Sequence, residues 1–165
     1  NRQHFEFEKS IRLNVTNETL DAHRVLVKWA VRKTDATILR EEEQWLEVPA
    51  LSAVWMDKVE LPQIDCFNEY VSYEAWENNQ IISQGTVIFS YPKYFRYLNP
   101  GLTVRVDGDE IVVKAEAYAK SVEIRNANDD LILEDNYFDM NAGEHRVKIL
   151  DGKPDGLTVR SVYDI

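Results

Sequence analysis

Apolar and polar side chains alternate at every second position along most of the chain, a pattern typical of β-strands with one buried face. The clearest run, residues 24–32, places four apolar side chains on one face: Val25, Val27, Trp29 and Val31. Trp29 lies at the centre of this run, so it is predicted to be a core residue, like the buried tryptophan of immunoglobulin-like sandwiches. Similar runs predict further strands in the first half at residues 11–15, 38–48, 53–61, 69–76 and 80–89.

Residues 38–48 are compatible with two structures. Their Glu, Gln, Arg and Leu residues favour helix, yet the last apolar side chains alternate with polar ones and a proline ends the run. The alternation favours a strand with Trp45 on the solvent face. In that strand Glu42 points away from Glu41 and Glu43, which predicts a solvated edge rather than a catalytic carboxylate cluster.

Residues 53–61 carry a less regular pattern. Trp55, Val59 and Leu61 fall on one face and are predicted to lie together. Asp57 shares their parity, and a carboxylate at an inward position indicates a bulge or a strand end.

Two short polar segments predict hairpin turns. Asn78-Asn79 separates two strand-like runs, and Asp107-Gly108-Asp109 separates two more. The second half of the chain then continues as strand-like runs around residues 102–106, 111–117, 122–124, 131–133, 145–150 and 157–162. No helix of normal length is expected, so the whole pattern predicts an all-β fold.

The segment from Tyr91 to Gly101 separates the two halves. It contains two prolines, a glycine and four aromatic residues, Tyr91, Tyr94, Phe95 and Tyr97. Exposed aromatics are unfavourable, so all four are predicted to pack between two domains and make a stiff joint. The expected organisation is two tandem immunoglobulin-like antiparallel β-sandwich domains, residues 1–91 and 101–165, joined by an aromatic linker at residues 92–100.

An aromatic corner is expected near the C-terminus, in residues 135–144. Tyr137 and Phe138 stand between two strand-like runs and are predicted to plug the open end of a sandwich core. The tyrosine hydroxyl is expected to bond to nearby backbone. The Asn141–Gly143 segment would then supply the left-handed backbone of a tight connection. This interpretation makes the corner structural rather than catalytic.

Composition and charge exclude several classes of function. The chain has 165 residues and a net charge of −10, divided equally between residues 1–95 and 96–165. No basic face is indicated, so neither nucleic acid nor an anionic membrane surface is an expected partner. No apolar run is long enough to span a membrane. The lone Cys66 cannot form an internal disulfide and is expected to pack as a small apolar residue.

Metal and cofactor chemistry find little support in the sequence. The three histidines are scattered, with no ligand spacing, so no metal site and no cofactor are predicted. Two oxygen-rich segments, residues 107–109 and 126–130, could hold calcium. Because turns use the same residue types for backbone reasons, a turn is the simpler interpretation.

Several motifs together resemble the C-terminal part of β-mannosidases of glycoside hydrolase family 2. In that family a D-N-Y-F-D-x-x-x-G-E segment lies in the last immunoglobulin-like domain, and here it stands as residues 135–144. The connector Pro92-Lys93-Tyr94-Phe95 and the strand entry Ala119-Lys120-Ser121-Val122 are similar as well. The resemblance is sharpest over residues 92–150 and weaker before them, where only residues 15–19 match a family motif.

The resemblance implies that the catalytic machinery lies elsewhere. Family members are retaining glycosidases with two catalytic glutamates, and both are implied to lie on a TIM barrel upstream of this segment. No catalytic residue is therefore expected here, and the expected partners are that barrel and a second subunit in a homodimer. The start without methionine suggests a segment of a larger protein. If the source is bacterial, a periplasmic or extracellular location is expected.

Two other functions remain open from the sequence. A carbohydrate-binding module would stack a glycan on exposed aromatics, and Trp45, Trp76 and Tyr70 are the candidates whose parity places them on the solvent face. A surface or adhesion protein built of immunoglobulin-like domains is also compatible, because fold alone does not fix function.

Overall fold

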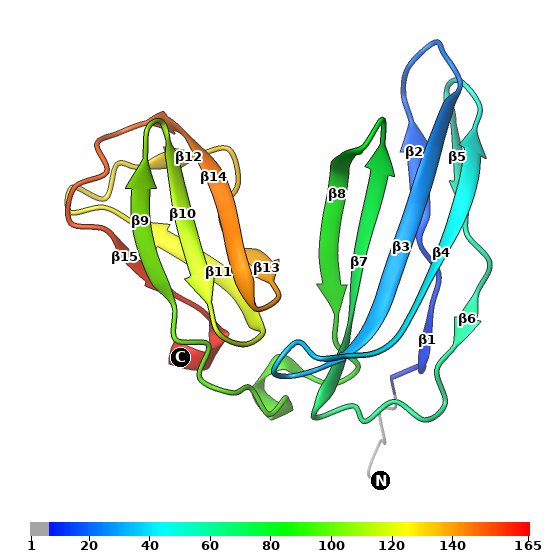
Figure 1. Ribbon diagram of the computed structural model, residues 1–165, viewed down its shortest axis with the longest axis horizontal. Coiled ribbons are helices and arrows are strands. Elements are labelled where there is room, and N and C mark those ends of the chain that lie inside the picture. The colour runs from blue at the N-terminus through cyan, green and yellow to red at the C-terminus, as the bar shows by residue number, and fades with distance from the viewer. Residues whose placement is uncertain (1–6) are drawn as a thin grey trace, which may run out of the picture. The chain divides into compact units, whose positions relative to one another are not determined.

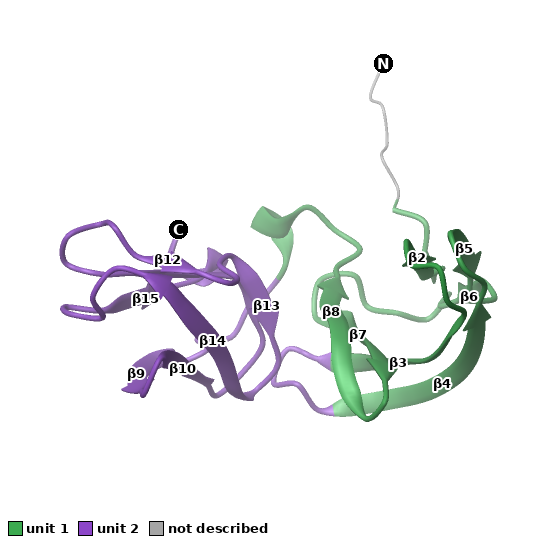
Figure 2. Ribbon diagram, turned by 90° about the horizontal axis from the view of Figure 1, so that it is seen from above, with its two compact units in different colours: residues 1–32, 38–95 green, residues 33–37, 96–165 purple. Residues whose placement is uncertain are grey.

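The computed structural model describes residues 7–165, and they form two compact β-rich units. Of the described residues, unit 1 takes 7–32 and 38–95, and unit 2 takes 33–37 and 96–165 (Figure 2). Strands and two short 3-10 helices are the regular elements of the described chain. The predicted all-β fold is confirmed. The predicted boundaries at residues 91 and 101 stay predictions.

Unit 1 is built around one four-stranded antiparallel sheet in the order β4-β3-β7-β8 (Figure 1). Two smaller pairs, β2 with β5 and β1 with β6, supply its second layer, because Ile11, Val15 and Val54 from these strands pack into the same core. The strands are β1 (Ser10–Ile11), β2 (Asn14–Asn17), β3 (His23–Lys33), β4 (Ile38–Val48), β5 (Ser52–Trp55), β6 (Val59–Glu60), β7 (Glu69–Glu77) and β8 (Gln80–Val87).

The ambiguous run at residues 38–48 is a strand along its whole length. It pairs antiparallel with β3 from Ile38 to Val48, so tertiary pairing overrides the helical propensity of its glutamates. Trp45 lies on the solvent face, as predicted, and is 52% exposed.

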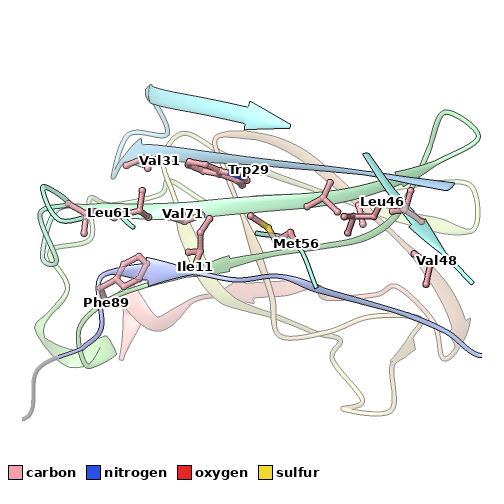
Figure 3. Packing of buried hydrophobic residues seen from close by; sticks show 13 residues of the cluster. Ile11, Trp29, Val31, Leu46, Val48, Met56, Leu61, Val71 and Phe89 are labelled. Carbon is pink, nitrogen blue, oxygen red and sulfur yellow. The ribbon is translucent and has the colours of Figure 1, made fainter. Parts of the chain in front are cut away.

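The core of unit 1 is centred on the inner face of β3. Val25, Val27, Trp29 and Val31 are all buried there, which confirms the strongest sequence pattern. Figure 3 shows core side chains from other strands and from loops packed around Trp29 and Val31. These partners include Ile11, Leu46, Val48, Met56, Leu61, Ile64, Val71 and Phe89.

The prediction for residues 53–61 is half right. The strand does break near Asp57, since β5 ends at Trp55 and β6 begins at Val59. The inward placement of Trp55 is wrong, because Val54 and Met56 take the core positions and the indole is exposed. Similarly, the run predicted at residues 11–15 is divided between β1 and β2.

The hairpin predicted at Asn78-Asn79 joins β7 to β8. Both asparagines have positive φ, 50° and 62°, as a turn matched to the twist of a hairpin requires. One residue of β8 bulges opposite Ala75 and Trp76.

Cys66 is half-buried beside the core of unit 1, in keeping with a packing role.

Unit 2 is a smaller sandwich of two antiparallel sheets, β12-β14-β10-β9 and β13-β11-β15. Side chains from both sheets form its core: Ile111, Val113, Ala115, Ala119, Val122, Ile124, Phe138, Met140 and Val147. The predicted turn at Gly108, with φ of 63°, joins β9 to β10. The strands are β9 (Thr103–Asp107), β10 (Glu110–Ala115), β11 (Ala119–Arg125), β12 (Ile132–Leu133), β13 (Phe138–Met140), β14 (Gly143–Asp151) and β15 (Thr158–Arg160), followed by η2 (Val162–Asp164).

The connector between the units contains the short helix η1 (Pro92–Tyr94). Phe95 is buried and Tyr97 is half-buried, but the rings of Tyr91 and Tyr94 are exposed. The expectation that all four aromatics pack away from water is therefore wrong for two of them. Whether the joint is stiff stays a prediction.

Tyr97 gives the connector a measurable pH signature. Burial, with a smaller effect from the Asp139 carboxylate, raises the pKa of Tyr97 to about 12 from the ordinary value of 10.0. The folded protein therefore holds this proton more tightly than the unfolded chain does. We expect stability to be intact below pH 10 and to fall as the pH rises toward 12. A phenolate titration at high pH should contain a late-ionising step that disappears in Tyr97→Phe; a titration that Tyr97→Phe leaves unchanged above pH 10 would contradict this assignment.

Candidate functional site

Opposite charges face each other across β3 and β4 on the solvent face of unit 1. The strand register pairs Arg24 with Glu47 and Lys28 with Glu43, and an ion pair of 3.3 Å joins the first two. Glu41 and Glu43 thus lie on the basic face of β3, where cross-strand pairs stabilise a sheet. The acidic run acts as the solvated edge predicted from its sequence.

A hollow of about 360 Å³ lies on the same face. It is lined by main chain and side chains of β3, β4 and β7, among them Lys28, Arg32, Glu41 and Glu74. Arg32 is committed to a hydrogen bond from its Nε to the Ser72 hydroxyl, 2.8 Å. The hollow therefore carries both basic and acidic side chains, and one of its cations is already bonded to a neighbouring strand.

The candidate sugar-stacking residues differ widely in access. Tyr70 is fully buried, at 0% exposure, so the hypothesis is wrong for this residue: its ring has no face open to a glycan. Trp45 is exposed, but the Arg24 guanidinium lies over its ring at 4.3 Å. Trp76 is half-buried, with the Lys28 ammonium 5.1 Å from its ring centroid. A sugar would have to compete with these cation–π contacts, and stacking on either tryptophan stays a prediction.

The predicted corner is held by side chains that bond to the neighbouring strand. The Asn136 carbonyl oxygen accepts the Ile124 N–H at 3.0 Å, and its amide donates to the Ile124 carbonyl at 3.1 Å. This single side chain therefore mimics one rung of a β-ladder and attaches the corner to β11. Sequence reasoning missed Asn136, whose partner lies twelve residues away in the chain.

Asp139 secures the same strand at a second point. Its Oδ1 accepts the Ser121 N–H at 2.9 Å, and its Oδ2 lies 3.4 Å from the Lys120 ammonium. Ser121 has φ of 53° and sits in the bulge where the pairing of β11 with β13 shifts register. A carboxylate that receives the freed N–H stabilises such a bulge.

The two corner aromatics behave differently. Phe138 is buried and its ring stacks on that of His145, with the centroids 4.2 Å apart. Burial lowers the pKa of His145, and the nearby carboxylates of Asp135 and Glu134 only partly oppose this shift. Tyr137 was expected to bury its ring, and that prediction is wrong: the ring is 61% exposed on a backbone with φ of 62°.

The Tyr137 side chain is part of a charge cluster on unit 2. It hydrogen-bonds the carboxylate of Glu123, a buried residue that also pairs with Arg125 and Arg160. Burial raises the pKa of Glu123, but these three partners outweigh it and bring the pKa below its ordinary value. Because its partners stabilise the ionised form, the buried Glu123 carboxylate is a structural group of unit 2.

The tight connection predicted at residues 141–143 has positive φ only at Gly143.

No grouping of three or more histidine, cysteine or acidic residues suited to a metal ion occurs within residues 7–165. In the oxygen-rich 126–130 turn, Asn126 donates to Asp130 at 2.6 Å and to the Lys153 carbonyl at 2.9 Å. Its own carbonyl oxygen accepts the Asp130 N–H. Asn126 and Asp130 therefore bond to each other, and Asn126 also bonds to nearby backbone.

A network of polar side chains lies in unit 1, around the start of β3 and the end of β7, and was not predicted from the sequence. The Thr19 hydroxyl lies 2.8 Å from one ring nitrogen of His23, and Glu77 contacts the other nitrogen. The buried Asn17 amide donates to the carbonyls of Asp21, Val48 and Pro49. These bonds connect the ends of β2, β3, β4 and β7. Val48, Pro49 and Glu77 lie more than thirty residues from their partners, so these contacts could not be predicted from the sequence.

Comparison with known protein families identifies both units. Residues 9–94, just over half of the chain, match the family model described as Mannosidase Ig/CBM-like domain. The chain belongs to the Mannosidase Ig/CBM-like family. Residues 97–165 match a second model, described as an Ig-fold domain. The expected resemblance to immunoglobulin-like domains of mannosidases is confirmed by these two matches.

Solved structures of larger glycoside-processing enzymes share the fold of this Mannosidase Ig/CBM-like chain. A β-D-mannosidase from Dictyoglomus thermophilum matches with a TM-score of 0.77 and 14% identity, over 93% of this chain and 20% of that one. An exo-chitosanase from Amycolatopsis orientalis matches with a TM-score of 0.59 and 14% identity, over 90% of this chain and 25% of that one. An exo-β-D-glucosaminidase matches with a TM-score of 0.58 and 13% identity, again over 90% of this chain and 25% of that one. The chain thus spans a quarter or less of these proteins.

A search of curated proteins finds no match to the chain. Across residues 7–165, no helix has the length and apolar character needed to cross a membrane.

Proposed function

We propose that the chain is the non-catalytic C-terminal region of a family 2 glycoside hydrolase that removes terminal β-D-mannosyl residues. Its catalytic TIM barrel would lie upstream in the same polypeptide, and this region would pack against the barrel or against a partner subunit. The observation that carries the proposal is the match of 93% of this chain to 20% of a β-D-mannosidase. The family match over residues 9–94 supports the same assignment.

The chemistry of the described side chains supports an accessory role. The residues of the D-N-Y-F-D segment bond to strand β11 through Asn136 and Asp139, so they stabilise unit 2 rather than present reactive groups. The acidic run of β4 faces basic residues of β3. Retaining glycosidases need two carboxyl groups facing each other at roughly 5 Å across the substrate, and in this account both belong to the barrel.

Removing this region from the full-length enzyme tests the proposal. We expect the truncated enzyme to unfold at lower temperature and to lose activity on an aryl β-D-mannoside, because a barrel surface normally covered by the region becomes exposed. Substitution of the two barrel glutamates in the intact enzyme is the matched control and should abolish activity without lowering thermal stability. A truncated enzyme with unchanged stability and activity would contradict the packing role.

A further inference from the structure

Three aromatic rings of unit 1 form one exposed cluster. The rings of Phe7 and Tyr91 meet edge to face with centroids 5.2 Å apart, and Tyr91 meets Tyr94 in the same way at 6.2 Å. Their exposed fractions are 40%, 46% and 55%. The Lys93 ammonium lies 5.0 Å from the Tyr94 ring centroid at the rim of the cluster. Contiguous exposed apolar groups with a polar rim are typical of an interaction surface.

The core of unit 1 does not require these rings. None of the three belongs to the buried cluster around Trp29, and Phe95 is the connector residue that is buried. The turn that carries Tyr91 and Tyr94 is fixed by backbone bonds, Tyr94 N–H to the Tyr91 carbonyl and Phe95 N–H to the Pro92 carbonyl. Pro92 further restricts that backbone. The cluster is therefore held in place before any partner binds, which lowers the entropic cost of docking.

The position of Phe7 indicates what covers the cluster. Residues 9–11 are paired to residues 59–61, through the Ser10–Glu60 and Ile11–Val59 register and a 2.7 Å bond from the Leu61 N–H to the Lys9 carbonyl. Phe7 precedes this anchored segment by two residues. In the full-length protein of the proposed function, an upstream domain would be tethered near the cluster, and tethering raises its effective concentration there. In the matching β-D-mannosidase, four-fifths of the chain lies outside the region shared with this one.

We propose that the Phe7–Tyr91–Tyr94 cluster is the surface on which the upstream catalytic domain of the same polypeptide docks. This inference rests on the proposed function and names the contact that the accessory region uses. Tyrosine is enriched among residues that dominate binding energy at interfaces. The edge-to-face packing leaves no flat pair of parallel rings, so the cluster suits a protein surface better than a stacked sugar.

Tyrosine nitration followed by mass spectrometry tests this directly. In the full-length enzyme, Tyr91 and Tyr94 should react roughly tenfold more slowly than in the 165-residue chain, the ratio expected when the docked state holds about nine-tenths of the molecules. Tyr137, exposed on unit 2, is the internal control and should react equally in both. The paired variant Tyr91→Ser with Tyr94→Ser should lower the unfolding temperature of the full-length enzyme and leave that of the 165-residue chain unchanged. Trp55→Ala, which removes an exposed ring elsewhere on unit 1, should change the unfolding temperature of both proteins equally.

The outcomes separate this inference from the function on which it rests. Equal reactivity of Tyr91 and Tyr94 in both proteins overturns the docking surface, even if truncation shows that the region stabilises the enzyme. If truncation has no effect, the proposed function fails as well. If Tyr91 and Tyr94 of the isolated 165-residue chain became less reactive toward nitration as its concentration rose, the cluster would be an interface between two copies of this chain. That result would overturn the inference. A response to mannose in place of protection would assign it to a glycan, with the same consequence.

Discussion

Replacing Trp29 by alanine is expected to destabilise unit 1 by about 3–5 kcal/mol, the usual cost of removing a large aromatic ring from a packed core. The ring is 4% exposed at the centre of β3, and strands of both layers contact the cluster to which it belongs. A domain of this size is stable by only about 5–15 kcal/mol. The variant should therefore unfold at much lower denaturant concentration, with a slope close to that of the unaltered protein.

The positions of the tryptophans allow the unfolding of unit 1 to be followed by fluorescence. All four tryptophans, at positions 29, 45, 55 and 76, belong to unit 1, so indole fluorescence reports on that unit alone. Trp55→Ala is the matched control, because it removes the same side chain from an exposed site, where the Arg12 guanidinium lies 5.0 Å from the ring centroid. We expect it to cost no more than about 1 kcal/mol. Equal losses in the two variants would show that Trp29 is not at the centre of the core.

Replacing Asp139 by alanine should have the second largest effect, a loss of about 2–3 kcal/mol confined to unit 2. The substitution removes a charged acceptor and leaves the Ser121 N–H unsatisfied in a bulge whose backbone is already left-handed. The side chain is only 14% exposed, so water does not readily replace the carboxylate. Calorimetric unfolding should show the loss, while the tryptophan-reported transition of unit 1 stays in place.

The same motif supplies the control for this substitution. Asp135 is exposed at the start of the segment, and Asp135→Ala should change the stability by no more than about 0.5 kcal/mol. Hydrogen exchange at the Ser121 amide gives a local readout, because only loss of the Asp139 carboxylate frees that proton. Equal stability of the Asp139→Ala and Asp135→Ala variants would show that the Asp139 carboxylate does not stabilise the attachment of the motif to strand β11.

Strand positions could be predicted wherever one face of a strand is buried. Residues 38–48 were assigned within their observed bounds because their alternation matches pairing with β3, and Trp29 was placed in the core for the same reason. Trp55 was misplaced because the chain breaks after it, and the inward positions pass to Val54 and Met56. Alternation carries no information across such a break.

The candidate site was less predictable than the strands. Asn136 and Asp139 reach partners twelve and eighteen residues away, and such side chain to backbone bonds leave no periodic trace in a sequence. Tyr137 was expected in the core because most aromatics at sandwich corners are buried, yet its hydroxyl bonds the Glu123 carboxylate and leaves the ring exposed. A left-handed tyrosine can be recognised only when its backbone is seen.

Hydrolysis of an aryl β-D-mannoside by the 165-residue chain, measured beside the full-length enzyme at equal molar concentration, tests the accessory role most directly. The account predicts turnover by the full-length enzyme and a signal no greater than that of buffer from the 165-residue chain. Turnover by the chain alone, abolished by substituting one of its own carboxylates, would contradict the account.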